Sequence, residues 1–286
     1  MSTEKNKVEK GVLYLVATPI GNLADISERA VKVLSEVDFI AAEDTRNSLK
    51  LLCALGIHNE LVSYHEHNKR SSGERLVARL LSGEACALIT DAGMPAISDP
   101  GEDIVRLCQE AGIRVSVVPG ACAAVSALSL SGLSTVRFAF EGFLPAKTSD
   151  RRARLDGVKS EERTMIFYEA PHKLRATLAD MSGVFGADRK ISLCRELTKL
   201  NEEIYKTTIG EAVRLYEERE PRGEYVLVVE GCDRAQAADT EVLNLSPLEH
   251  IAKYEQEGMS RMDAIKRAAK ERGMSKSELY KLTVKD

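Results

Sequence analysis

The sequence predicts an α/β protein with two α/β domains and a small helical module at its C-terminus. Short apolar runs alternate with segments of helical periodicity between residues 12 and 229, a pattern typical of sheets built from strand and helix units. The chain has 286 residues, enough for two domains that each bury their own core. After Pro247 the apolar runs give way to three short amphipathic segments. We therefore expect two sheet-based domains and a helical extension.

The first domain is predicted over residues 11–120, after a disordered tail at residues 1–10. Its apolar runs predict strands at residues 12–17, 38–42, 85–90 and 114–118. Segments of helical periodicity lie between them, at residues 25–34, 48–55, 74–81 and 101–111. Regular alternation of this kind favours a mainly parallel sheet.

The second domain is predicted over residues 121–232. Strands are expected at residues 136–140, 164–168, 190–193 and 225–229, with helices up to residue 130 and at residues 173–181 and 209–217. Residues 233–246 are polar and alanine-rich, which predicts a linker. Residues 247–286 then predict a helix-turn-helix-like module, with helices at 248–256, 261–272 and 276–282 and with Ser260 and Ser275 at N-cap positions.

The composition indicates a globular protein of the cytoplasm. It is 44% hydrophobic and 29% charged, and no apolar stretch is continuous enough for a signal sequence or a membrane span. The six cysteines form no CxxC pair and no metal-ligand spacing, which predicts reduced core residues. The net charge of -4 requires any nucleic-acid surface to be a local patch.

The loops that follow the apolar runs are the places to search for chemistry, because ligands of parallel sheets bind beyond the carboxyl ends of strands. Four such loops are unusual, at residues 18–22, 91–101, 119–122 and 168–172. None has the GxxxxGK[ST] or GxGxxG pattern of a phosphate-binding loop. Their small residues, backbone carbonyls and few carboxylates suit a cationic ligand with adenosine and amino-acid ends. Taken singly, each loop could also be a plain turn.

Nine segments in a fixed order resemble one protein family. They are YLVATPIGNLADISERA, AAEDTR, YHEHN, ITDAGMPAISDPG, VVPGACAAVSALSLSGL, FEGFLPAK, FYEAPHKL, CRELTKLNEE and GEYVLVVEG, and they span residues 12–231. On these segments the chain resembles the bacterial 2′-O-methyltransferases of a cytidine in the decoding region of small-subunit ribosomal RNA. That family is similar in fold to the methylases of corrin and siroheme precursors. At Asn201 the resemblance leads us to expect a histidine, so no catalytic role is assigned there.

The resemblance implies two α/β domains of the tetrapyrrole-methylase type, a homodimer, and S-adenosylmethionine in a cleft between the domains. In the first domain it places this cofactor near Pro19, Asp91, Gly93, Met94, Gly120, Ala121 and Cys122. From the second domain it adds Tyr168 and Ala170 to the cofactor site.

Two polar clusters are candidates for holding the target nucleotide. One contains His65, Glu66 and His67, our catalytic candidates, together with Asn68. The other contains Glu43, Asp44 and Arg46. A ribose hydroxyl is a poor acid, so we expect one member to assist its deprotonation. Alternatively, these side chains brace the loop. A metal site formed by His65 and His67 is a weaker hypothesis, because no further residues with metal-ligand spacing accompany them. We therefore expect no metal.

Two basic segments are candidates for contact with RNA. The first carries Lys147, Arg151, Arg152 and Arg154 against Asp150, and it is either a mobile segment that binds phosphates or a solvated helix face. The second, between Ser260 and Lys285, has eight Lys or Arg residues and three acidic residues. We expect this tail to recruit ribosomal RNA or small subunits; the alternative is a dimer-stabilising or soluble appendage.

The predicted function is therefore methylation of a cytidine 2′-hydroxyl in 16S ribosomal RNA, with S-adenosylmethionine as the cofactor. A small-molecule methylase acting on a tetrapyrrole is the nearest alternative, because the same scaffold serves that chemistry. A non-catalytic RNA-binding assembly factor is the second.

Overall fold

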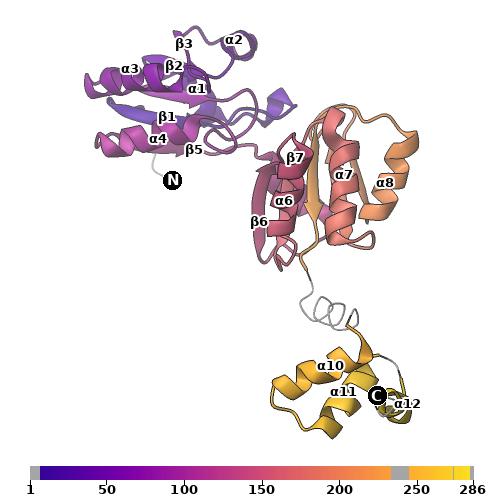
Figure 1. Ribbon diagram of the computed structural model, residues 1–286. Helices are drawn as coiled ribbons and strands as arrows, with labels where there is room; N and C mark the ends of the chain where they lie inside the picture. Colours follow the sequence, from indigo (N-terminus) through magenta and orange to yellow (C-terminus); the bar gives the residue numbers. More distant parts are fainter. Residues whose placement is uncertain (1–6, 233–244, 273, 284–286) are drawn as a thin grey trace.

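The computed structural model describes residues 7–232, 245–272 and 274–283 (Figure 1). It contains two five-stranded sheets, followed by a group of three helices. The fold class predicted from the sequence is confirmed. Most of the predicted linker, residues 233–244, and most of the predicted N-terminal tail, residues 1–6, lie outside the described residues.

The first sheet has the strand order β3-β2-β4-β1-β5 and is parallel throughout. Its strands are β1 (Val12–Val16), β2 (Phe39–Ala42), β3 (Leu61–Ser63), β4 (Cys86–Ile89) and β5 (Arg114–Val118). Helices α1 (Glu28–Glu36) and α2 (Thr45–Ala54) pack on one face, and α3 (Lys69–Leu81) and α4 (Gly101–Glu110) pack on the other. The central strands β1, β2 and β4 are apolar because both of their faces are covered.

Helix α4 begins at Gly101 as predicted, whereas the other three helices of this half begin at positions that differ from those predicted. Helix α1 begins at Glu28, because Ser27 caps it after a short 3-10 turn, η2 (Leu23–Asp25). Helix α2 begins three residues early, capped by Asp44, and α3 begins at Lys69 rather than residue 74. The polar segments after β2 and β3 are therefore short loops that lead directly into helices.

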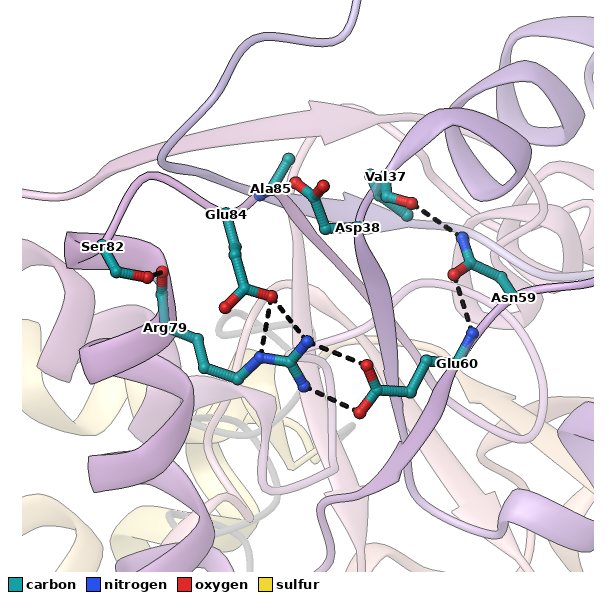
Figure 2. Close-up of polar contacts among 8 residues, drawn as sticks. All are labelled: Val37, Asp38, Asn59, Glu60, Arg79, Ser82, Glu84 and Ala85. Atoms are coloured by element: carbon teal, nitrogen blue, oxygen red, sulfur yellow. Dashed lines mark hydrogen bonds and ion pairs between the residues drawn. The ribbon is translucent and has the colours of Figure 1, made fainter.

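The amino ends of β2, β3 and β4 are held together by Arg79 of α3 (Figure 2). Its guanidinium lies 2.9 Å from Glu60, 2.6 Å from Glu84 and 3.6 Å above the ring of Phe39. Beside it, Asn59 donates to the carbonyls of Leu34 and Val37. These contacts fix the sheet at the edge opposite the loops that could bind ligands.

The second sheet has the order β6-β7-β10-β8-β9, in which only the β6–β7 pair is parallel. Its strands are β6 (Phe138–Phe143), β7 (Thr164–Glu169), β8 (Lys190–Arg195), β9 (Glu203–Thr208) and β10 (Tyr225–Val229). Helices α6 (Thr148–Gly157), α7 (Pro171–Phe185) and α8 (Ile209–Glu218) cover one face. Helix α5 (Ala123–Ser131) covers the other, together with Ile20 from the loop after β1.

The C-terminal module consists of α10 (Pro247–Gln256), α11 (Arg261–Glu271) and α12 (Lys276–Thr283). Ser246 and Ser260 cap the first two helices. The apolar core lies between the three helices and includes Ile251, Ile265 and Leu279. His250 is fully buried and lies 3.0 Å from Glu271, and burial lowers the pKa of this histidine.

The prediction for the cysteines was partly wrong. All six are free, but only Cys86, Cys108 and Cys194 are buried, whereas Cys53 is exposed on α2. Among the helices that the structure describes, none has the length and apolar character needed to cross a membrane.

Candidate active site

The site that the loops predict lies at one edge of the first sheet. Because its five strands are parallel, the loops after β1, β2, β3, β4 and β5 all leave from this edge. Three of the four unusual loops, at residues 18–22, 91–101 and 119–122, are among them. The fourth, at residues 168–172, belongs to the second half.

Backbone hydrogen bonds join the loop after β1 to the loop after β4. The amide of Thr18 donates to the carbonyl of Gly93 at 2.9 Å, and the amide of Gly93 donates back at 3.1 Å. Gly93 has a φ of 85°, a conformation that favours glycine. The structure thereby brings Pro19, which follows Thr18, close to Gly93 and Met94.

The loop after β5 reaches the same place. A Cβ built on Gly93 would lie 3.6 Å from the carbonyl oxygen of Ala121, so these two backbones are near neighbours. Cys122 caps α5, and Gly120 and Asp91 are exposed. The first-half residues predicted to bind the cofactor therefore come from three adjoining loops.

Loops of the first half contact the second half. Ile20 packs into the apolar cluster formed by α5, β7, β8 and β10. A Cβ built on Gly142 of β6 would lie 3.3 Å from Oγ of Ser98, which belongs to the loop after β4. The two halves therefore meet at the edge that carries the predicted site.

Tyr168 and Ala170 lie at the end of β7 and the start of α7. The Tyr168 hydroxyl accepts a hydrogen bond from the amide of Ala124 at 3.2 Å, and its ring packs edge-on against Phe140 and Phe143. Burial raises the pKa of Tyr168 to about 12, so the phenol is neutral at physiological pH. Ala170 is the N-cap of α7.

Glu43 is the central member of a second polar group, at the ends of β2 and β4. Its Oε2 accepts a hydrogen bond from Thr90 Oγ1 at 3.0 Å. Burial raises the pKa of Glu43 above its ordinary value; Asp91 and Asp99 add to the rise, whereas the Thr90 hydrogen bond and His65 oppose it. His65 and Asp91 thus lie close enough to act on this carboxyl group.

Arg46 and Asn47 border this group on α2. Arg46 forms an ion pair with Asp44 at 2.8 Å, yet its side chain is 87% exposed and can reach a ligand. Its hydrogen bonds lower the pKa of Asp44 to about 2. Asn47 donates to Asp91 at 3.2 Å. The sequence analysis missed Asn47 and Thr90, although Thr90 is the polar residue that ends an apolar run.

The loop after β3 is braced by Asn68. Its Oδ1 accepts from the amide of His65 at 2.8 Å, and its Nδ2 donates to the carbonyl of Ser63 at 3.2 Å. The Asn68 amide group is thus occupied within the loop, where it positions His65. Binding of substrate by Asn68 stays a prediction.

The other members of this loop differ in exposure. Nδ1 of His65 is buried and has no hydrogen-bond partner among the described residues. Glu66 is 63% exposed and pairs with Lys69 at 2.8 Å, and His67 is exposed. A buried ring nitrogen without a partner is unusual in a folded protein and marks His65 for function.

The segment from Lys147 to Arg154 is the helix α6 rather than a mobile segment. Arg151 is buried, with an ion pair to Asp180 at 2.6 Å and a bond to the carbonyl of Ala146 at 3.0 Å. Its guanidinium joins α6 to α7, so we do not include Arg151 among the RNA contacts proposed below. Lys147 and Arg152 remain exposed, and Arg152 bonds the other oxygen of Asp180.

Comparisons with known proteins agree with this architecture. Residues 12–213 match the family described as Tetrapyrrole (Corrin/Porphyrin) Methylases. The uroporphyrin-III-C-methyltransferase from Thermus thermophilus superposes with a TM-score of 0.56 at 21% identity, covering 76% of this chain and 94% of its own. Diphthine synthase gives a TM-score of 0.58 at 12% identity, with coverage of 77% and 89%. At these identities the superpositions show the fold alone.

Sequence relatives are closer. A protein called ribosomal RNA small subunit methyltransferase I from Halalkalibacterium halodurans is 48% identical over 275 residues, covering 96% of this chain and 95% of its own. The protein of the same name from Pseudomonas aeruginosa is 53% identical over 223 residues, covering 77% and 79%. The chain therefore belongs to the tetrapyrrole (corrin/porphyrin) methylase family, as a methyltransferase that groups with the proteins called ribosomal RNA small subunit methyltransferase I.

Proposed function

We propose that this protein transfers the methyl group of S-adenosylmethionine to the ribose 2′-hydroxyl of a cytidine in small-subunit ribosomal RNA. The observation that carries the proposal is the 48% identity, along 96% of the chain, to a protein named for methylation of that RNA. The cytidine and its 2′-hydroxyl come from the resemblance of the sequence motifs. Such an enzyme works in the cytoplasm, where ribosomes are assembled.

The residues at the sheet edge fit this cofactor. Gly93, Gly120 and Ala121 carry little or no side chain, so their backbone can approach a ligand closely. The exposed carboxylate of Asp91 can bind hydroxyl or ammonium groups. We assign cofactor binding to these four residues with Pro19, Met94 and Cys122, and to Tyr168 and Ala170 from the second half.

Bound S-adenosylmethionine supplies an activated methyl group on a positively charged sulfur. The protein must hold the ribose oxygen in line with that group and accept the hydroxyl proton. We assign the role of proton acceptor to the carboxylate of Glu43. The hydrogen bond from Thr90 Oγ1 to its Oε2 orients this carboxylate. His65 lies beside it, and the exposed Arg46, Glu66 and His67 border the place for the nucleotide.

The C-terminal module provides a surface for the RNA backbone. Arg261, Lys266 and Lys270 of α11 are exposed, and the two lysines form no ion pair with any described residue. Helix α10 instead exposes Glu249, and Glu257 at its C-cap is also exposed. Phosphates favour the lysine side of this module, and Lys147 and Arg152 of α6 offer further contacts.

The homodimer implied by the motif resemblance stays a prediction. Sedimentation equilibrium of the full chain would measure it directly, with twice the monomer mass of 31.4 kDa as the expected result.

Methyl transfer from labelled S-adenosylmethionine tests the proposed function. The full chain is incubated with small ribosomal subunits, with free 16S RNA, or with uroporphyrinogen, and the labelled RNA is digested to nucleosides. We expect label in 2′-O-methylcytidine from one of the RNA samples. Label in uroporphyrinogen instead would make the protein a tetrapyrrole methylase, and RNA binding without transfer would make it an assembly factor.

A further inference from the structure

The segment between β8 and β9 has a backbone conformation that is unusual for its residue types. Glu196 has a φ of 52° and Thr198 a φ of 65°. Glycine and asparagine adopt such angles readily, whereas a β-branched residue such as threonine rarely does. Non-glycine residues stay in this region only where their surroundings hold them.

Ion pairs and hydrogen bonds keep this segment in its conformation. Lys199 lies 2.9 Å from Glu196 and 2.8 Å from Glu224. The amide of Thr198 donates to Glu202 at 2.7 Å. The loop is therefore fixed in its strained form by contacts on both sides of Thr198.

These contacts direct the Thr198 hydroxyl toward the loop after β1. A Cβ built on Gly21 would lie 2.8 Å from Oγ1 of Thr198 and 3.1 Å from the carbonyl oxygen of Leu197. Leu197 and Ile20 pack in the same apolar cluster. Thr198 therefore lies against the loop that carries Pro19, at the junction of the two halves.

The hydroxyl itself has no use within the described residues. Oγ1 of Thr198 is buried and has no hydrogen-bond partner there. Burying a hydroxyl without a partner is costly, and a valine would fill the same space without that cost. A turn that needs a positive φ would be served better by glycine. Neither packing nor turn geometry therefore explains a threonine at this position.

We infer that Thr198 is a cofactor-binding residue, whose hydroxyl forms a hydrogen bond to S-adenosylmethionine held by the loop after β1. The inference rests on the proposed function, because it takes the ligand to be that donor. It assigns a role to the CRELTKLNEE segment, which the proposed site does not otherwise use.

Three substitutions separate the hydroxyl from the backbone. Thr198→Val keeps the shape and the β-branch but removes the hydroxyl. Thr198→Ser keeps the hydroxyl. Thr198→Gly removes the hydroxyl and also relieves the backbone strain. Thr135→Val, at an exposed threonine, is the matched control.

Calorimetry on the full-length variants measures the Kd of S-adenosylmethionine and of S-adenosylhomocysteine. Loss of one neutral hydrogen bond should raise the Kd about three- to tenfold in Thr198→Val and Thr198→Gly. Thr198→Ser and Thr135→Val should bind as the wild type does. The Tm of Thr198→Gly should be unchanged or higher, which a packing role would not produce.

Two outcomes would overturn the inference while leaving the proposed function in place. One is an unchanged Kd in Thr198→Val; the other is an equal loss of affinity in Thr198→Ser and Thr198→Val, with a lowered Tm in both. If the wild type itself binds neither ligand, the proposed function and the inference fail together.

Discussion

At the scale of single residues, hydrogen bonding separates the side chains that we propose to act from those that support. Glu43 and His65 are partly buried, and Nδ1 of His65 has no partner among the described residues, whereas Asn68 and Arg151 use their polar atoms inside the protein. The sequence made His65 a catalytic candidate and grouped Glu43, Asn68 and Arg151 as candidates for binding substrate, because residue type and spacing do not reveal which atoms are already paired. The hydrogen bonds of the folded chain separate these side chains.

Replacing Glu43 with glutamine tests its role as proton acceptor. Only the ionised carboxylate accepts a proton, and burial raises the pKa of Glu43 above its ordinary value of 4.5. Wild-type turnover should therefore rise with pH as this group loses its proton. Glu43→Gln should lower turnover about a hundredfold or more and remove that rise.

Single-turnover rates across pH, together with calorimetry of donor binding, measure both effects. His65→Ala should also lower turnover with donor affinity intact. Glu110→Gln, at the end of α4 on the opposite edge of the sheet, is the control. Full turnover in both Glu43→Gln and His65→Ala would show that these two side chains only support the loops.

Arg151 and Arg152 offer a matched pair on one carboxylate. Both bond to Asp180, but the side chain of Arg151 is 6% exposed and that of Arg152 is 62% exposed. Arg151→Ala removes the buried partner of the Asp180 carboxylate and leaves it paired only with the exposed Arg152, so it should lower the free energy of unfolding by about 3 kcal/mol. Arg152→Ala should lower it by less than about 1 kcal/mol. Urea titrations followed by circular dichroism compare them, and equal losses would contradict the assignment of Arg151.

At the scale of elements, the hydrophobic pattern predicted the strands and helices that are well buried and did not predict those that are half exposed. The residues of β10 are all buried, and its predicted bounds are those of the structure. The edge strand β9, EIYKTT, has no fully buried residue, and the sequence analysis did not predict it. Helix α6 buries only Leu155 and the paired Arg151, so it shows no apolar periodicity.

The contacts between the loops were likewise not predictable from the hydrophobic pattern. Four of the five parallel strands of the first sheet were predicted, with β3 as the exception, and they are enough to locate the edge at which the candidate site lies. The bonds between Thr18 and Gly93 and between Thr90 and Glu43 join residues distant along the chain. No local pattern carries that information.

At the scale of the whole molecule, the C-terminal module and the two sheets have separate cores. Cofactor binding is assigned entirely to the loops of the two halves, and RNA recruitment to α11 and α6. A chain that ends at Asn244 should therefore keep its Kd for S-adenosylmethionine. Its methyl transfer to RNA should be lost, or should fall more steeply with salt than that of the full chain.

Transfer assays at increasing potassium chloride compare the two chains, and calorimetry checks that the shortened chain still binds donor. Lys266→Glu with Lys270→Glu in the full chain should reproduce the salt effect, whereas Glu257→Lys at the C-cap of α10 should not. Unchanged RNA methylation by the shortened chain would refute a recruiting role for the module.

The paired hydrogen bonds between Thr18 and Gly93 have a mechanical consequence. Thr18 Oγ1 also donates to the carbonyl of Thr90 at 3.1 Å, and Thr90 in turn holds Glu43. The loops that carry the proposed donor site and the proposed proton acceptor are thus joined by hydrogen bonds. A shift of the first loop on donor binding would be passed through Thr90 to Glu43, so we expect the loading of one substrate to position the group that receives the other.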